Sequence, residues 1–250
     1  MRMHEISIAT ETIFSFAGLP ITNALLMGWL TTIIIAVFAL FFPRRPALVP
    51  SGIQNAFEWF VERALVMMEG VFGNRAKAEK YFPFIATIFI VILASNWIGI
   101  FPFLGTIGFF ETPPAHEANA VFVPLFRSAA SDLNFTLALA IVSLGATHVF
   151  GISAIGFFTH AQTYISLKGP VKFFIGILEI IAEIAKMISF SFRLFGNIFA
   201  GEVLLLILGA LVPLVIPLPF WALKFFVGLI QAFIFAILTT VFISTATSAH

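Results

Sequence analysis

Arg193 lies inside a long apolar segment, in the stretch SFRLFGNIFAGE that runs from Ser191 to Glu202. An arginine at bilayer depth costs roughly 2.5–3.5 kcal/mol on insertion scales. It cannot avoid that cost by losing its proton, because its pKa lies above about 12. The charge therefore needs a carboxylate, water or a partner protein nearby, and an intramembrane arginine of this kind indicates a function in handling ions.

Other polar side chains share this segment with Arg193. At about 100° per residue of an α-helix, one stripe within about 80° of Arg193 holds Glu179, Glu183, Lys186 and Asn197. Glu202 follows nine residues after Arg193, which places it about 180° around the helix and about 13.5 Å along it. This spacing argues against an ion pair between Arg193 and Glu202. It predicts two separate polar environments, one toward each side of a membrane.

These charges also have structural interpretations, which the spacing leaves open. Glu179, Glu183 and Lys186 have the i,i+3 and i,i+4 spacings of pairs that decorate a membrane interface. Glu202 and Lys224 could extend toward the outer face, and Arg193 could bind backbone carbonyl groups.

Composition indicates an all-α polytopic membrane protein, since 60% of the residues are apolar, 10% are charged and the mean hydropathy is +1.08. The absence of cysteine excludes disulfides and thiolate metal sites. A net charge of +1 gives no indication of nucleic-acid binding. Without a glycine-rich phosphate loop, the chain is expected to hold no nucleotide, and no metal or organic cofactor is expected either.

The histidines do not indicate a haem site. His148 falls in a predicted membrane segment, where we interpret it as a polar residue that packs between helices. The other histidines are expected in loops or tails, namely His4, His116, His160 and His250.

Apolar runs predict one integral membrane domain over residues 1–250 with five membrane segments. They are expected at residues 21–42, 82–104, 133–158, 173–211 and 220–243, after an outer tail at residues 1–20. Residues 51–72 show apolar positions at helical spacing. This pattern predicts an amphipathic helix on the cytoplasmic membrane surface or against a partner, with an ordinary loop helix as the alternative.

Positive charges set the expected orientation. They gather in residues 43–80 and recur at Lys168 and Lys172, which places these regions in the cytoplasm, the N-terminus outside and the C-terminus inside. The fourth segment spans roughly 39 residues and exceeds the ~20 needed to cross a bilayer, so it must be steeply tilted or lie partly outside the membrane.

At these residues the chain resembles the family of a subunits of bacterial F-type ATP synthases. The resemblance rests on RLFGN-x-x-AGE (Arg193 to Glu202), on Glu179 fourteen residues upstream, and on WALKFFVGLIQAFIFAIL (Trp221 to Leu238). Asn96 with the nearby Gly-x-x-Pro adds weaker support. The match covers most of the chain after residue 80.

The resemblance implies a stator subunit with two offset proton half-channels beside a rotating c ring, which couples proton flow to ring rotation for ATP synthesis. Its last two segments would form a long tilted hairpin facing the ring. Arg193 would meet the ring carboxylate. The predicted proton path comprises Glu202, Lys224, Gln231, Glu179, Glu183, Asn197 and Asn96.

Two positions differ from the family pattern. Many relatives have histidine in place of Lys224, and some have aspartate in place of Gly99, so the outer proton relay is expected to differ. If the chain reverses near Pro213, Lys224 lies opposite Glu202 and Gln231 lies opposite Arg193. A reversal near Pro217 would instead move Gln231 toward Glu202; we favour the first register. The Lys224 ammonium would then help to keep Glu202 ionised by direct attraction.

The resemblance also implies a multi-pass protein of the bacterial inner (plasma) membrane, with a periplasmic N-terminus and a cytoplasmic C-terminus. Its partners would be the c-subunit ring, peripheral stalk b-type subunits, the rest of the synthase, the lipid bilayer and protons. The main alternative is a secondary transporter or ion channel in which Arg193 binds an anionic substrate, although no internal repeat supports a transporter. A structural subunit of a respiratory complex is a further alternative.

Overall fold

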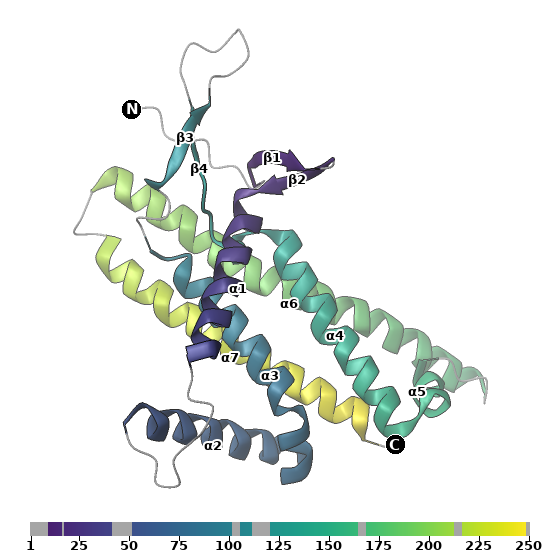
Figure 1. The fold of residues 1–250 in the computed structure, drawn as a ribbon. Coiled ribbons are helices and arrows are strands. Elements are labelled where there is room, and N and C mark those ends of the chain that lie inside the picture. The colour runs from purple at the N-terminus through teal and green to yellow at the C-terminus, as the bar shows by residue number, and fades with distance from the viewer. Residues whose placement is uncertain are drawn as a thin grey trace. The chain divides into compact units, whose positions relative to one another are not determined.

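The computed structural model describes residues 10–16, 18–41, 52–101, 106–111, 121–164, 169–212 and 217–248. Its helices are α1 (Asn23–Phe41), α2 (Ile53–Phe72), α3 (Arg75–Ile98), α4 (Leu133–Ile155), α5 (Phe157–Tyr164), α6 (Pro170–Leu211) and α7 (Pro217–Thr247) (Figure 1). A short 3-10 helix, η2 (Ala129–Ser131), precedes α4. The strands form two small antiparallel hairpins, β1 (Thr12–Phe16) with β2 (Leu19–Thr22) and β3 (Gly108–Glu111) with β4 (Val121–Pro124).

Five of these helices, α1, α3, α4, α6 and α7, are long and apolar enough to cross a membrane. The prediction of an all-α polytopic chain with five membrane segments is therefore confirmed. α6 has 42 residues, which corresponds to about 63 Å of helix, roughly twice the thickness of a bilayer core. The two β-hairpins were not predicted.

The second membrane helix is shifted from its predicted bounds of residues 82–104. α3 begins at Arg75 because Asn74 caps it: the Asn74 Oδ1 accepts hydrogen bonds from the backbone N–H groups of Ala76 and Lys77, at 2.8 and 3.3 Å. The helix ends at Ile98. Gly99 follows it, and glycine favours a helix end.

The third membrane helix is shorter than the predicted residues 133–158. α4 ends at Ile155, and Gly156 has a φ of +85°, a conformation that suits glycine and ends helices. A separate short helix, α5, follows. His160 therefore lies in a helix and is buried, which corrects the prediction that it lies in a loop.

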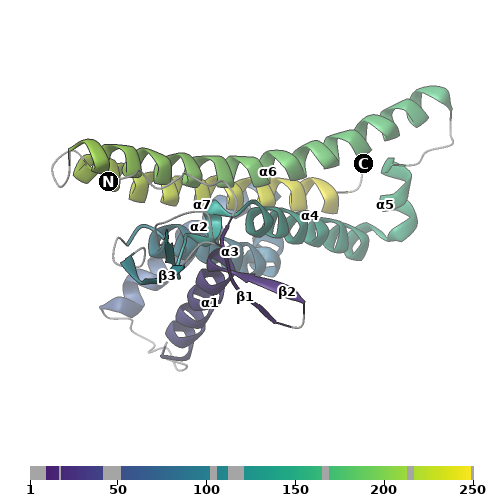
Figure 2. The same ribbon diagram turned by 90° about the horizontal axis from the view of Figure 1, so that it is seen from above.

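The chain divides into two compact units. The first unit holds residues 1–36, 91–138 and 191–232, and the second holds residues 37–90, 139–190 and 233–250. Both units contain a stretch of α6 and a stretch of α7, and within each unit these two stretches lie side by side (Figures 1 and 2).

Buried polar side chains connect the helices of the first unit. The Asn96 Nδ2 of α3 donates a hydrogen bond to the Gly228 carbonyl of α7 at 3.0 Å. The hydroxyls of Thr136 in α4 and Ser191 in α6 lie 3.0 Å apart. Such interhelical hydrogen bonds between small and amide side chains are typical of membrane helix bundles.

An apolar core holds the second unit together. α2 contributes Leu65, Met68 and Phe72, which pack with residues of α3 and α7. The apolar stripe of α2 thus packs partly against its own chain, while Ile53, Trp59 and Phe60 remain exposed. The Arg75 guanidinium binds Glu62 of α2 and Glu79 of α3, at 2.6 and 2.9 Å, which holds the turn between the two helices.

Several residues used for the predicted orientation lie outside the described residues. They are the N-terminal tail up to residue 9, Arg44, Arg45, Lys168 and Pro213. The direction in which the chain crosses the membrane therefore stays a prediction.

Candidate functional site

Arg193 lies on an exposed face of α6. Its neighbours Leu194 and Ile198 are each only 1% exposed, while Arg193 and Asn197 point away from the core of the first unit. The side chains around Arg193 on that face include exposed Phe192. A permanent charge is therefore presented within an apolar surface of the helix.

Glu202 lies beside two cationic side chains in the first unit. Its Oε2 lies 3.7 Å from the Nε of Arg127, and the exposed fractions of the two side chains are 20% and 17%. Lys224 is buried against the same turn of α6, and a Cβ added to Gly201 would lie 3.4 Å from the Lys224 Cε. Lys224 attracts Glu202 electrostatically. Two cations therefore lie beside Glu202, Arg127 from the segment before α4 and Lys224 from α7.

Arg127 is a functional candidate that the sequence interpretation missed. It is the one positive residue between residues 105 and 132. That isolation was a usable signal. The guanidinium also lies 6.0 Å from the centre of the Phe199 ring on α6, so Arg127 is positioned against this helix by two contacts.

The contact between Lys224 and Gly201 also bears on the register of α6 and α7. Lys224 of α7 is level with Gly201 of α6. Arg193 lies eight residues before Gly201, and Ala232 lies eight residues after Lys224. In two helices that run in opposite directions, Gln231 then lies within one residue of the level of Arg193. This favours the register expected for a reversal near Pro213.

Asn96 is fully buried and lies at a close approach of α3 to α7. A Cβ added to Gly228 would lie 3.1 Å from the Asn96 Cβ, so the two helices need glycine there. A Cβ added to Gly99 would lie 2.5 Å from the Ser128 Oγ. The side chain of Ser128 thus occupies the space that an aspartate at position 99 would need, which explains this departure from the family pattern.

Four buried side-chain atoms of the described residues have no hydrogen-bond partner in the protein. They are the Thr31 Oγ1, Ser95 Oγ, Asn96 Oδ1 and Ser128 Oγ, and all four residues belong to the first unit. Buried polar groups are nearly always satisfied by protein or by ordered water. These four atoms are therefore candidate positions for bound water in the first unit.

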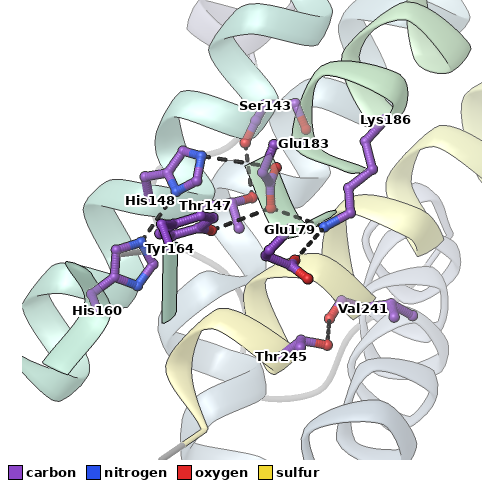
Figure 3. A network of polar contacts seen from close by, with 10 residues as sticks. All are labelled: Ser143, Thr147, His148, His160, Tyr164, Glu179, Glu183, Lys186, Val241 and Thr245. Carbon is purple, nitrogen blue, oxygen red and sulfur yellow. Dashed lines mark hydrogen bonds and ion pairs between the residues drawn. The ribbon is translucent and has the colours of Figure 1, made fainter. Parts of the chain in front are cut away.

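A second polar cluster surrounds Glu183 in the second unit (Figure 3). The Glu183 Oε1 accepts hydrogen bonds from the Lys186 Nζ at 2.9 Å and from the Tyr164 hydroxyl at 3.3 Å. Lys186 also donates to Glu179 at 3.4 Å. The His148 Nε2 lies 3.9 Å from the Glu183 Oε2.

The same cluster opens into a pocket of about 360 Å³ lined by His148, His160, Tyr164, Glu183 and apolar side chains. Burial raises the pKa of Tyr164, and the charge of Glu183 raises it further. Burial lowers the pKa of His160. Sequence interpretation missed His160 and Tyr164 because it did not predict α5, and it assigned His148 only to helix packing.

In both clusters, carboxylates lie close to cationic side chains on helices that are otherwise apolar. Carboxylates, imidazoles and phenols accept and release protons, so both clusters are suited to proton transfer. Within the described ranges, no group of three or more histidine, aspartate or glutamate side chains is arranged to hold a metal ion.

The family described as ATP synthase A chain matches residues 25–244, a range that contains both clusters. The chain belongs to this family. Similar proteins named ATP synthase subunit a include one from Campylobacter jejuni strain 81-176, 38% identical over 221 residues that cover 87% of each chain. Another, from Helicobacter acinonychis strain Sheeba, is 34% identical over 220 residues, which cover 87% of this chain and 86% of the relative.

Family membership confirms the resemblance found in the sequence. The chain is a subunit of the membrane sector of an ATP synthase, the sector that translocates protons. It is a multi-pass membrane protein. This result favours the synthase over the transporter and over the structural subunit of a respiratory complex.

The two cations beside Glu202 allow a direct prediction. Arg127→Gln and Lys224→Met are each expected to move the pH profile of proton translocation toward higher pH by about one unit, because Glu202 loses a neighbouring positive charge that favours its ionised form. The profile is measured as ATP-driven proton pumping by membrane vesicles at a series of pH values.

The matched control variants are Arg127→Lys and Lys224→Arg, which keep the charge and should keep the profile. An unchanged profile in Arg127→Gln would remove Arg127 from the environment of the proton-carrying acid. An unchanged profile in Lys224→Met would indicate that Lys224 only packs against the Gly201 turn of α6 and does not affect the protonation of Glu202.

Proposed function

We propose that this chain is the stator subunit that guides protons to and from a rotating ring of c subunits through two offset half-channels, and so couples proton flow to ring rotation for ATP synthesis. One observation carries the proposal. A single long helix, α6, carries Arg193 between two separate acidic clusters, and each cluster belongs to a different compact unit.

The outer half-channel is proposed to pass through the first unit and to deliver protons to Glu202. The unsatisfied buried atoms of Ser95, Asn96 and Ser128 support this assignment, because they would bind the water that a proton path needs. Lys224 and Arg127 would stabilise the ionised acceptor. Gln231 and Asn197 are proposed to take part where this path approaches Arg193, as the register of α6 and α7 suggests.

The inner half-channel is proposed to end at Glu179 and Glu183 in the second unit. Their carboxylates share the Lys186 ammonium, and Glu183 borders a pocket wide enough for water. An ion-pair role and a proton-path role for these charges are thus compatible, because Glu183 both pairs with Lys186 and lines the pocket.

Arg193 is proposed to separate the two half-channels. A fixed positive charge in a low-dielectric region attracts an ionised carboxylate of the ring and allows it to pass, while it repels a proton that would cross directly. Each proton that crosses about 100 mV releases about 2.3 kcal/mol. Leakage past Arg193 would dissipate that free energy without rotating the ring.

The proposed partners are the c ring, b-type subunits of a peripheral stalk and the rest of the synthase. Exposed apolar side chains of α6 and α7, such as Phe192 and Phe226, are suited to contact with apolar ring helices. We place the chain in a bacterial inner membrane as one integral domain, with a periplasmic N-terminus, a cytoplasmic C-terminus and α2 on the cytoplasmic side. Nucleotide chemistry is assigned to other subunits.

Cysteine labelling tests the two half-channels, and the chain contains no native cysteine. The Ser131 hydroxyl donates a hydrogen bond to the Ser128 carbonyl at 2.8 Å and lies close to Glu202, and Ala161 lines the pocket beside Glu183. A membrane-impermeant thiol reagent is expected to label Ser131→Cys only from the periplasmic side and Ala161→Cys only from the cytoplasmic side.

The control is Val149→Cys, an exposed apolar position of α4 that would face lipid and stay unlabelled from both sides. Labelling of Ser131→Cys and Ala161→Cys from the same side would contradict two offset half-channels. Intact whole cells and inside-out vesicles give the two directions of access.

A further inference from the structure

Two histidines of the second unit lie in direct contact. The His148 Nδ1 of α4 and the His160 Nε2 of α5 are 3.1 Å apart, which is hydrogen-bond distance (Figure 3). Only one of these two nitrogens can donate in the neutral pair, so the rings share one proton between them. The other nitrogen of His148 faces Glu183, with its Nε2 3.9 Å from the Glu183 Oε2.

The distance of 3.9 Å is too long for a hydrogen bond and suits a bridging water. The pocket reaches His148, His160 and Glu183 alike. Its volume of about 360 Å³ leaves room for water beside these polar groups, and apolar side chains form most of its lining. A water can therefore bridge Glu183 and His148, and the two rings contact each other directly.

We propose that His148 and His160 form a proton relay that connects Glu183 to the pocket beside α5, that water enters this pocket, and that the relay is the inner end of the proton path. The proposal rests on the proton-translocating function proposed above and names residues that the family pattern did not indicate. Imidazole suits this task because it carries an acceptor and a donor on opposite sides of one ring.

In one transfer, the relay takes up one proton at His148 and releases one proton at His160, so the number of protons on the two rings does not change. The Glu183 carboxyl gives its proton, through water, to the His148 Nε2, and the His148 Nδ1 gives its own proton to the His160 Nε2. His160 then releases the proton on its Nδ1, the nitrogen beside Gly151, to water that reaches the ring from the pocket, and Glu183 is left ionised. Both rings end in the other tautomer and return to the first when they reorient.

Charged and titratable groups of α5 and α6 surround the pair. Glu179, Glu183 and Lys186 come from α6 and Tyr164 from α5. Burial lowers the pKa of His160 most, the neighbouring His148 lowers it further, and Glu183 partly opposes them. His160 therefore tends to release a proton at neutral pH and accepts one when the cytoplasmic side is acidified.

The glycine at position 151 gives the relay a second structural basis. A Cβ added to Gly151 would lie 2.8 Å from the His160 Cε1, 2.9 Å from its Nδ1 and 3.0 Å from the backbone carbonyl oxygen of Ala246 in α7. Glycine at this position therefore leaves room both for the His160 ring and for the backbone of α7. Gly145, on the same helix, has no atom within 4 Å of such a Cβ, and an alanine fits there without displacing anything.

The relay is tested by ATP-driven proton pumping in inside-out vesicles that contain the whole synthase, with each rate normalised to assembled complex. His160→Gln, which keeps a hydrogen-bonding side chain, is expected to lower the rate about tenfold, less than the ~100-fold typical of a positioned proton donor because pocket water partly replaces it. Because burial lowers the pKa of His160, the parental rate should rise only when the bath is acidified below the ordinary imidazole range near about pH 6.5, and this rise should be absent in the variant.

Gly151→Ala tests the geometry with both histidines retained. It is expected to lower the pumping rate several-fold, whereas Gly145→Ala keeps the parental rate. A parental rate and pH profile in His160→Gln would overturn the relay. An equal loss of pumping rate at every pH in His160→Gln would also overturn it, because it would indicate that the histidines only hold α5 against α4. Equal pumping rates in the two glycine variants would overturn it as well.

These outcomes are separable from failure of the proposed function. If Arg193→Ala left proton coupling intact, the stator assignment itself would fail whatever the histidine variants do. If Arg193→Ala abolished coupling while His160→Gln behaved as the parent, the stator assignment would stand and only the relay would fall.

Discussion

Arg193→Ala is expected to lower proton-coupled ATP synthesis at least about 100-fold, the scale seen when a positioned electrostatic group is removed from a low-dielectric site. Arg193 is exposed on α6, so no folded core is lost with its side chain and the complex should still assemble. The measurement is ATP synthesis by energised vesicles, together with the amount of the chain retained in purified synthase.

Two variants make this result specific. Arg193→Lys keeps a positive charge but loses the planar guanidinium. If the charge alone matters, this variant should retain more coupled ATP synthesis than Arg193→Ala. If the planar, bidentate geometry of the guanidinium matters, the two variants should lose equal amounts of coupled synthesis. Lys172→Ala removes an exposed cation from the first turn of the same helix and should have no effect. Unimpaired coupled synthesis in Arg193→Ala would exclude the proposed stator role.

Glu202→Gln is expected to lower proton translocation about 100-fold in both the synthesis and the pumping direction, because an amide of the same shape cannot carry the proton. Glu202 is the carboxylate that lies beside Arg127 and Lys224. Removal of its charge leaves those two cations close together, so some loss of assembled complex is also expected. Proton pumping per assembled complex separates the two effects.

Glu202→Asp and Glu58→Gln serve as controls for this prediction. The aspartate keeps a titratable group at a shorter reach and should restore part of the rate. Glu58 is exposed on α2, and its amide variant should pump at the parental rate. If Glu202→Gln also pumped at that rate, protons would have to enter by a route that avoids this cluster.

The membrane architecture could be predicted because it depends on local properties of the chain. A helix that crosses a bilayer must be about 20 apolar residues long wherever it packs, so five such helices were visible as five apolar runs. The unusual length of α6 and the position of Arg193 within it were visible for the same reason. Helix ends were less accurate, since they depend on a cap such as Asn74 or on the conformation of Gly156.

Contacts between distant parts of the chain could not be obtained in this way. Arg127 and Glu202 are 75 residues apart in the chain, and nothing in the spacing of either residue indicates the other. His148 and His160 meet only because Gly156 ends α4 and α5 turns back beside it. Both pairs depend on how helices pack, which is set by side chains from several elements at once.

The amino-acid sequence alone thus determined the class of the protein, its five membrane helices, its family and the residues of α6 that carry charge. All of these follow from composition, periodicity or motifs within one segment. The tertiary structure decided that Glu202 has Arg127 as its ion-pair partner, that Asn96 binds the backbone of α7, and that a histidine pair borders Glu183. In a membrane helix, burial in lipid and burial in protein favour the same apolar residues, so the sequence cannot distinguish the two faces until the helices are packed.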